Sequence, residues 1–181
     1  MKKKGTGERL ELHVFNETTI EHLHRYAIAL DLVQNKKVLD IACGEGYGSN
    51  LLAGKAAHVT GMDIDDAVVQ QAAIRYKKPN LAFLTGDAQN ICLPEKSYDV
   101  VTCFETIEHV AEQEKMIGAI KNVLKPGGLL IISTPNKKTY SDNTGNNNPH
   151  HVKELYEHEF LGLLNQYFRN IELLKQQTTL S

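Results

Sequence analysis

The sequence has few cysteines, and they form no pattern. Cys43, Cys92 and Cys103 are the three cysteines among 181 residues, and each has apolar neighbours in the sequence. An odd and scattered set of this kind fits reduced thiols, and neither a disulfide framework nor a zinc site. We therefore expect a protein of a reducing compartment with no metal site.

Long apolar runs and an excess of basic charge are also missing. No apolar stretch approaches the roughly 20 residues that span a bilayer, and the lysines at positions 2–4 precede polar residues where a signal peptide would have an apolar segment. The formal net charge of -2 offers no basic footprint for nucleic-acid phosphates. We predict a cytoplasmic protein with no membrane span and no nucleic-acid partner, and the sequence does not indicate its oligomeric state.

The chain does contain a predicted strand, a glycine turn and the start of a helix, at Val38–Gly48. Gly44, Gly46 and Gly48 stand at alternate positions, so the backbone can turn tightly and approach a ligand where a Cβ would clash. The amides of the following helix N-terminus point at the same place. This stretch is a predicted socket for a nucleotide-sized ligand, although a glycine-rich turn alone does not identify that ligand.

Hydrophobic periodicity predicts a single domain in which strands and helices alternate after an irregular arm at residues 1–16. Helices are predicted at about 17–34, 47–53, 66–77, 109–124 and 156–167, and strands at 37–42, 57–63, 81–85, 98–104, 129–134 and 169–175. This order predicts parallel strands with right-handed crossovers, and so a doubly wound, three-layer α/β fold. The polar segment 135–149 has the length of a functional lid or a disordered segment.

Polar residues stand at or near the carboxyl ends of four of the predicted strands, at Asp40, Asp63, Asp87 and Glu105. Ligands of open α/β sheets bind beyond the carboxyl ends of the strands, so these side chains are expected to share one crevice. Asp63 follows Gly44 by 19 residues and is placed to accept hydrogen bonds from ribose hydroxyls.

A dinucleotide-binding module needs the same strand, turn and acidic residue. Two details argue against it. The spacing is Gly-x-Gly-x-Gly, and Asp40 lies four residues before the first glycine. A carboxylate so close to the turn would repel a pyrophosphate but could pair with the α-ammonium group of an amino-acid-bearing nucleoside.

Four motifs follow one another over roughly residues 36–134: VLDIACGEGYG, VTGMDID, LTGDAQNICLPEKSYDVVTCFETIEHV and LKPGGLLIISTPN. In this order they resemble the motifs of class I S-adenosylmethionine-dependent methyltransferases. The resemblance implies a Rossmann-like, mostly parallel sheet, S-adenosylmethionine as cofactor and S-adenosylhomocysteine as product. It divides the chain into an arm and helix covering the cofactor, 1–35, and a catalytic domain, 36–181. The family sheet usually has seven strands and six can be counted here, so we expect the last strand to be absent or to lie beyond Ser181 in the natural protein.

The resemblance also implies roles for the matching residues. Asp40 and the turn after it would hold the methionine part of the cofactor, and Asp63 would hold the ribose. Asp87 would meet the adenine amino group, with Met62 and Ile64 flanking the ring. The cofactor-binding residues expected in this way are Tyr26, Asp40, Ala42, Cys43, Gly44, Gly46, Gly48, Asp63, Ile64, Asp87, Ala88, Phe104 and Glu105, with Arg25 beside Tyr26.

The implied reaction is an in-line displacement of the methyl group from a sulfonium by an O, N or C nucleophile. Such a transfer needs alignment and exclusion of water more than it needs chemical groups of the protein. An oxygen nucleophile often needs a general base as well. The candidate bases are Glu105, Glu108, His109, His150 and His151.

A narrower likeness concerns the acceptor. The segments Thr6–Arg9, His22–Tyr26 and Asn148–Leu155 resemble parts of methyltransferases encoded with bacterial surface-polysaccharide enzymes. This likeness favours a small-molecule or glycan acceptor, and a quinone precursor is the nearest rival. The alternative function is a binding module that uses NAD or binds S-adenosylmethionine without turnover.

Overall fold

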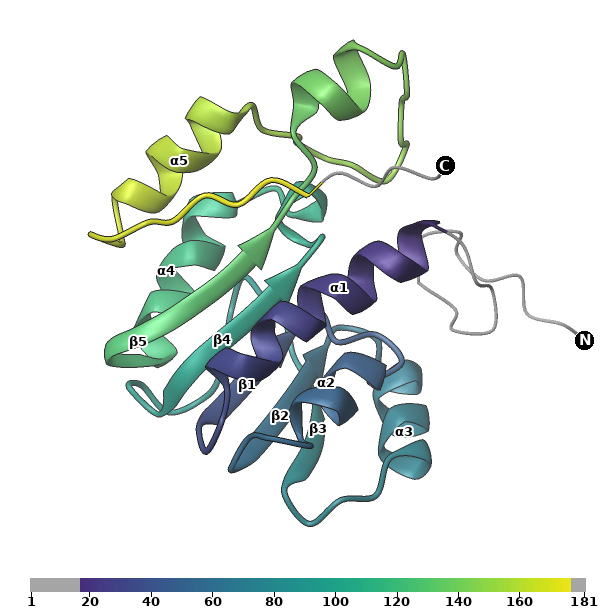
Figure 1. Ribbon diagram of the computed structural model, residues 1–181, viewed down its shortest axis with the longest axis vertical. Helices are drawn as coiled ribbons and strands as arrows, with labels where there is room; N and C mark the ends of the chain where they lie inside the picture. Colours follow the sequence, from purple (N-terminus) through teal and green to yellow (C-terminus); the bar gives the residue numbers. More distant parts are fainter. Residues whose placement is uncertain (1–16, 177–181) are drawn as a thin grey trace, which may run out of the picture.

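The computed structural model of the protein describes residues 17–176, which form a five-stranded, all-parallel sheet (Figure 1). The strands are β1 (Lys37–Ile41), β2 (His58–Asp63), β3 (Leu81–Thr85), β4 (Tyr98–Phe104) and β5 (Leu124–Ser133). Their order is β3-β2-β1-β4-β5, so the winding reverses direction between β1 and β4. The carboxyl ends of these two strands therefore mark the place where doubly wound sheets bind ligands.

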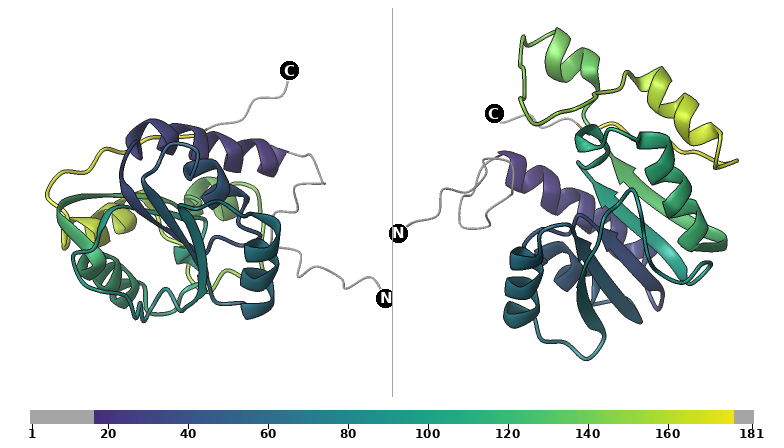
Figure 2. Two further views of the ribbon diagram at one scale, coloured as in Figure 1. Left: turned by 90° about the horizontal axis from the view of Figure 1, so that it is seen from below. Right: turned by 180° about the vertical axis from the view of Figure 1, so that it is seen from behind.

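Helices cover both faces of the sheet. They are α1 (Glu17–Leu32), α2 (Tyr47–Leu52), α3 (Asp66–Arg75), α4 (Gln113–Val123) and α5 (Glu157–Asn165). In Figure 1, α1 and α2 lie in front of the sheet and α4 lies behind it, and the view from behind in Figure 2 shows the reverse. The predicted doubly wound, three-layer α/β fold is confirmed.

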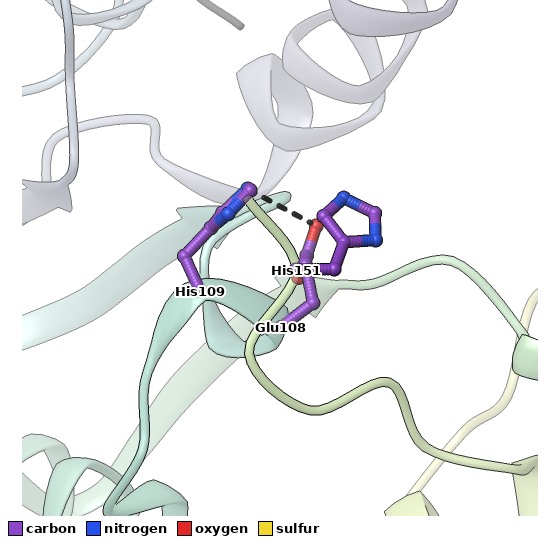
Figure 3. Close-up of side chains that lie close together, drawn as sticks. All are labelled: Glu108, His109 and His151. Atoms are coloured by element: carbon purple, nitrogen blue, oxygen red, sulfur yellow. Dashed lines mark ion pairs between the residues drawn. The ribbon is translucent and has the colours of Figure 1, made fainter. Parts of the chain in front are cut away.

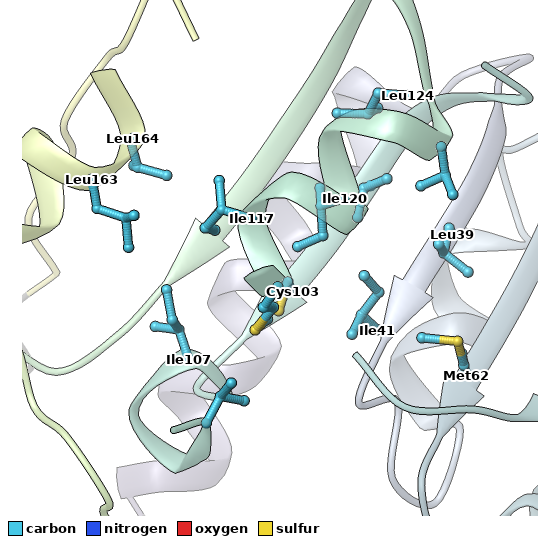
Figure 4. Close-up of a cluster of buried hydrophobic side chains, with 14 of the residues drawn as sticks. Leu39, Ile41, Met62, Cys103, Ile107, Ile117, Ile120, Leu124, Leu163 and Leu164 are labelled. Atoms are coloured by element: carbon cyan, nitrogen blue, oxygen red, sulfur yellow. The ribbon is translucent and has the colours of Figure 1, made fainter. Parts of the chain in front are cut away.

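The core has two parts, one on each face of the sheet. Val38 of β1 packs with the residues of α1 and α2, whereas Leu39 and Ile41 pack with those of α4 and α5. Figure 4 shows the second of these clusters, where Ile117 of α4 lies between the sheet and α5. Because the central strands are buried on both faces, they are apolar almost throughout, as is typical of parallel sheets.

Two expected boundaries between β4 and β5 are wrong. The helix expected from His109 starts at Gln113, because Ile107–His109 forms a separate 3-10 turn (η1) and Val110 then adopts an extended conformation. The strand expected from Leu129 starts at Leu124. The Lys-Pro-Gly-Gly segment lies inside this strand, where a register shift opposite Tyr98–Val100 accommodates it.

The part of the chain after β5 also differs from expectation. The segment 135–149 contains one π-helical turn, η2 (Lys138–Asp142), and Figure 1 shows it beyond the carboxyl ends of β4 and β5. The sixth strand expected at 169–175 is absent from the described residues. Ile171 of this segment packs against the core, but the segment pairs with no strand of the described sheet.

The irregular arm expected at residues 1–16 lies outside the described residues. Among the residues that are described, no helix has both the length and the apolar character needed to cross a bilayer.

Candidate functional site

The glycine turn joins β1 to α2 and has an unusual backbone. Ala42, Gly44 and Gly46 have φ angles of 54°, 52° and 80°, a left-handed conformation that is costly for a residue with a Cβ. No atom lies within 4 Å of the place where a Cβ on Gly44 would stand, so the space above the turn is open. Gly48 is needed for packing and not for the turn, because a Cβ there would lie 1.9 Å from the Tyr26 ring. It lets α1 pack on α2.

Asp63 is fixed at the end of β2 against this turn. One carboxylate oxygen accepts the Gly44 amide at 2.9 Å, and the other accepts the Asp65 amide at 3.0 Å. The side chain is 6% exposed, and the next residue, Ile64, is 71% exposed. Met62 points to the core on the other face of the strand. The end of β2 therefore combines an oriented carboxylate with an accessible apolar surface.

Asp40 is completely buried beneath the turn. Its carboxylate accepts hydrogen bonds from Ser49 at 2.6 Å, from Thr102 at 2.7 Å and from the Tyr26 hydroxyl at 3.2 Å. Burial raises the pKa of Asp40 to about 6, and the three hydroxyl donors oppose this shift. Asp40 thus places a negative charge under the turn without exposing it to solvent.

The N-terminal helix α1 brings Arg25 and Tyr26 to the site. The Tyr26 ring is buried and makes an edge contact with Phe104 at 5.0 Å between centroids. Arg25 places Nη2 3.5 Å from Glu105, while its Nη1 is buried with no hydrogen-bond partner among the described residues. A guanidinium group with an unused donor is suited to an anionic ligand group.

The end of β4 is strained in the same way as the end of β1. Glu105 has a φ of 48°, which is unusual for a residue with a side chain. Its carboxylate accepts a 2.6 Å hydrogen bond from Ser133, and its amide donates to the Ser133 carbonyl. Such outliers are found mostly where a ligand or a reaction requires them. Ala42 and Glu105 flank the switch point of the sheet.

The remaining expected cofactor residues are Asp87 and Ala88, which follow β3, and Cys43 in the glycine turn. The Asp87 carboxylate accepts the Gln89 amide at 2.8 Å, which forms a tight turn. Ala88 packs against the core cluster on the α4 face. Cys43 is buried, and burial raises the pKa of its thiol above the usual range.

Three of the five candidate bases lie together, beyond the end of β4 (Figure 3). Glu108 is 1% exposed, and its Oε1 lies 3.9 Å from Nε2 of His109. The rings of His109 and His151 are 4.9 Å apart. Burial raises the pKa of Glu108 to about 8, and the Glu105 carboxylate adds to this shift. His150 contributes its carbonyl, which accepts a hydrogen bond from His109.

Sequence reasoning missed the hydroxyl residues that support these carboxylates. They are Ser49 and Thr102 at Asp40, Ser133 at Glu105 and Thr134 at Glu108. One signal was available, since Thr102 is a polar residue in the buried second half of β4 and is the register partner of Asp40 in the β1–β4 pair.

Comparison with known proteins agrees with this geometry. A family model described as a methyltransferase domain matches residues 32–177. A Mycolicibacterium smegmatis protein named "Probable S-adenosylmethionine-dependent methyltransferase" is 39% identical over 130 residues, which are 71% of this chain and 50% of that protein. A ubiquinone biosynthesis O-methyltransferase of Coxiella burnetii is 32% identical over 140 residues, 72% of this chain and 55% of that protein. The chain therefore spans about half the length of the curated relatives it matches.

Among solved structures, the YcgJ protein of Bacillus subtilis superposes with a TM-score of 0.70. The match covers 81% of this chain and 68% of that protein at 23% identity, so it bears on the fold alone.

Proposed function

The chain belongs to the methyltransferase-domain family, and we propose that it binds S-adenosylmethionine and transfers the methyl group to a small-molecule or glycan acceptor. The observation that carries this proposal is the Asp63 carboxylate, held at the end of β2 by the Gly44 amide at 2.9 Å. A carboxylate oriented there by backbone amides is placed to accept the two neighbouring hydroxyls of a ribose.

The other residues of the crevice fit the rest of the donor. The open space at Gly44 leaves room for the methionine chain, and the exposed Ile64 offers a surface for the adenine ring. The unused Nη1 of Arg25 is suited to the methionine carboxylate. Asp40 would act from below the turn, where its buried charge attracts an α-ammonium group without direct contact.

When bound, S-adenosylmethionine supplies an activated methyl group on a positively charged sulfur. The chain's own residues then align the acceptor and exclude water. Phe104 would form the side of the crevice beneath the sulfur, and Glu105 would lie at the rim of the crevice. The candidate bases Glu108, His109 and His151 stand on the side from which an acceptor would enter.

Two kinds of acceptor are supported by separate observations. The relative named as a ubiquinone biosynthesis O-methyltransferase favours an oxygen atom of a quinone precursor. The likeness to methyltransferases encoded with surface-polysaccharide enzymes favours a sugar hydroxyl. Of the segments that carry it, Asn148–Leu155 includes His151, and Thr6–Arg9 lies outside the described residues. A screen of both acceptor classes, followed by S-adenosylhomocysteine release, distinguishes them.

Calorimetric titration tests the proposal. S-Adenosylhomocysteine should bind more tightly than NAD, and tighter binding of NAD would refute the methyltransferase function. In Asp63→Ala the dissociation constant for S-adenosylhomocysteine should rise by roughly 5- to 150-fold, because one or two hydrogen bonds worth about 1 to 3 kcal/mol are lost. Asp31→Ala is the matched control, since Asp31 lies on the outer side of α1 with an 85% exposed side chain. An unchanged constant in Asp63→Ala would remove this residue from the site.

A further inference from the structure

Glu108, His109 and His151 form a compact cluster of metal-ligating groups. One potential ligand atom from each residue lies within 4.8 Å of the other two. Figure 3 shows the three side chains directed toward one another from two separate segments, η1 and the chain after η2. The sequence led us to expect no metal site, because its three cysteines are scattered and odd in number.

Hydrogen bonds set the tautomer of both imidazoles. Nδ1 of His109 donates to the His150 carbonyl at 3.0 Å, and Nδ1 of His151 donates to Glu154 at 2.6 Å. A carbonyl or carboxylate oxygen only accepts, so each ring, when neutral, has its proton on Nδ1 and its lone pair on Nε2. Metal-binding histidines are oriented in this way by a carbonyl or carboxylate behind them.

The carboxylate of the cluster is oriented as well. Thr134 donates to Oε2 of Glu108 at 3.0 Å, and the other oxygen, Oε1, is the one near His109. The backbone carbonyl of Glu108 accepts the amides of Val152 and Lys153 at 2.8 and 3.0 Å, which ties the segment carrying His151 to η1. The ligand groups are therefore held by a second layer of hydrogen bonds.

The chemistry of the three groups selects the type of ion. Two imidazoles and one carboxylate suit Zn²⁺ and neighbouring transition metals, whereas Mg²⁺ and Ca²⁺ prefer oxygen ligands alone. Ligands about 2.1 Å from a tetrahedral zinc ion lie about 3.4 Å from one another. The Glu108–His109 distance of 3.9 Å approaches this value. Three protein ligands leave at least one coordination position open, as in catalytic zinc sites.

We propose that Glu108, His109 and His151 bind a divalent transition-metal ion of the zinc class with one open position. The next step rests on the proposed function: the open coordination position of the metal ion takes the hydroxyl oxygen of the acceptor. The hydroxyl proton would leave to solvent, the oxygen would form its bond to the methyl carbon, and the carbon–sulfur bond would break with its electron pair going to sulfur. A metal ion lowers the pKa of a bound hydroxyl, which makes the oxygen a better nucleophile.

Zinc binding by the full chain tests the site directly. The chain is freed of metal with a chelator and titrated with ZnCl₂ by calorimetry, in the absence of any methyl donor. We expect one zinc ion per chain, with the affinity reduced at least about tenfold in Glu108→Gln and in His151→Ala. His158→Ala is the control, because His158 is an exposed histidine on α5 outside the cluster. Absence of stoichiometric zinc, or equal affinity in all variants, would overturn the proposal.

Spectroscopy of the unmodified chain covers the case in which the variants fail to fold. X-ray absorption of the zinc-loaded protein should show imidazole scattering from two ligands, and its absence would overturn the site. Azide added to the cobalt-substituted protein should change the visible spectrum, and an unchanged spectrum would overturn the open position. If the chain binds S-adenosylhomocysteine but does not bind zinc, the metal site alone is refuted. If it binds zinc but does not bind S-adenosylhomocysteine, the methyltransferase function alone is refuted.

Discussion

Replacing Asp40 by Asn is expected to weaken the dependence of stability on pH. Burial raises the pKa of Asp40 from 3.8 to about 6 in the folded protein. Between these values the folded chain keeps a proton that the unfolded chain has lost. The stability that Asp40 contributes is therefore fully present below its pKa in the unfolded chain, and it is lost as the pH rises through the folded pKa of about 6.

The size of this effect follows from the two pKa values. Between about pH 4.5 and pH 7, ionisation of Asp40 lowers the free energy of unfolding by roughly 2 kcal/mol. Asn does not titrate, and its amide can still meet the hydroxyls of Tyr26, Ser49 and Thr102, because a hydroxyl both donates and accepts. The fall in the free energy of unfolding between about pH 4.5 and pH 7 should thus be smaller by roughly 2 kcal/mol in Asp40→Asn than in the wild type.

Urea denaturation at the two pH values, followed by circular dichroism, measures this difference. Asp31→Asn is the control, because the Lys55 ammonium holds the pKa of the exposed Asp31 below its usual range. That residue contributes stability at high pH and loses it as the pH falls, the opposite direction to Asp40. If Asp40→Asn kept the pH dependence of the wild type, the buried carboxylate would not be the titrating group and the reasoning would be wrong.

Three further substitutions probe the same region. Gly48→Ala should destabilise the protein by about 1 to 3 kcal/mol in thermal or urea unfolding, because the new Cβ would lie 1.9 Å from the Tyr26 ring. Thr102→Val should cost about 1.5 to 3 kcal/mol at pH 7 and less below pH 6, because it removes a donor to the ionised Asp40; equal costs at both pH values would contradict this. Arg25→Gln should weaken S-adenosylhomocysteine binding by roughly tenfold or more in calorimetry, and unchanged binding would exclude a carboxylate contact.

The central strands could be predicted because their signals are local. β3 and β4 occur at the expected residues, and β1 and β2 differ from expectation by one residue at one end. Each contains a cluster of apolar residues, and β2, β3 and β4 end at or just before a glycine or a polar residue, so the sequence marks both the burial and most of the boundaries. At the start of α3, Asp65 caps the helix by accepting the amides of Ala67 and Val68.

The errors arose where distant contacts decide the local structure. Glu108 and His109 form a separate turn, and the Glu108 carbonyl accepts amides from Val152 and Lys153, more than 40 residues away. Hydrophobic periodicity reflects local structure and does not indicate a contact between segments so far apart in the sequence. Likewise, Ile171 in the expected sixth strand packs on the core without a neighbouring strand, so the described residues at 169–175 form no strand.

The proposed site has a half that would hold the methyl donor and a half that would hold the acceptor, and the two are built in different ways. The donor half uses a turn, Asp63 and hydrogen bonds between β1, β2 and the residues that follow each of them. The acceptor half depends on η1 and on the segment after β5, which are joined through the Glu108 carbonyl and the His109–His150 hydrogen bond. We therefore expect substitutions in that segment to change the acceptor while leaving the turn and Asp63 intact. This arrangement explains why the sequence identifies the methyl donor more readily than the acceptor.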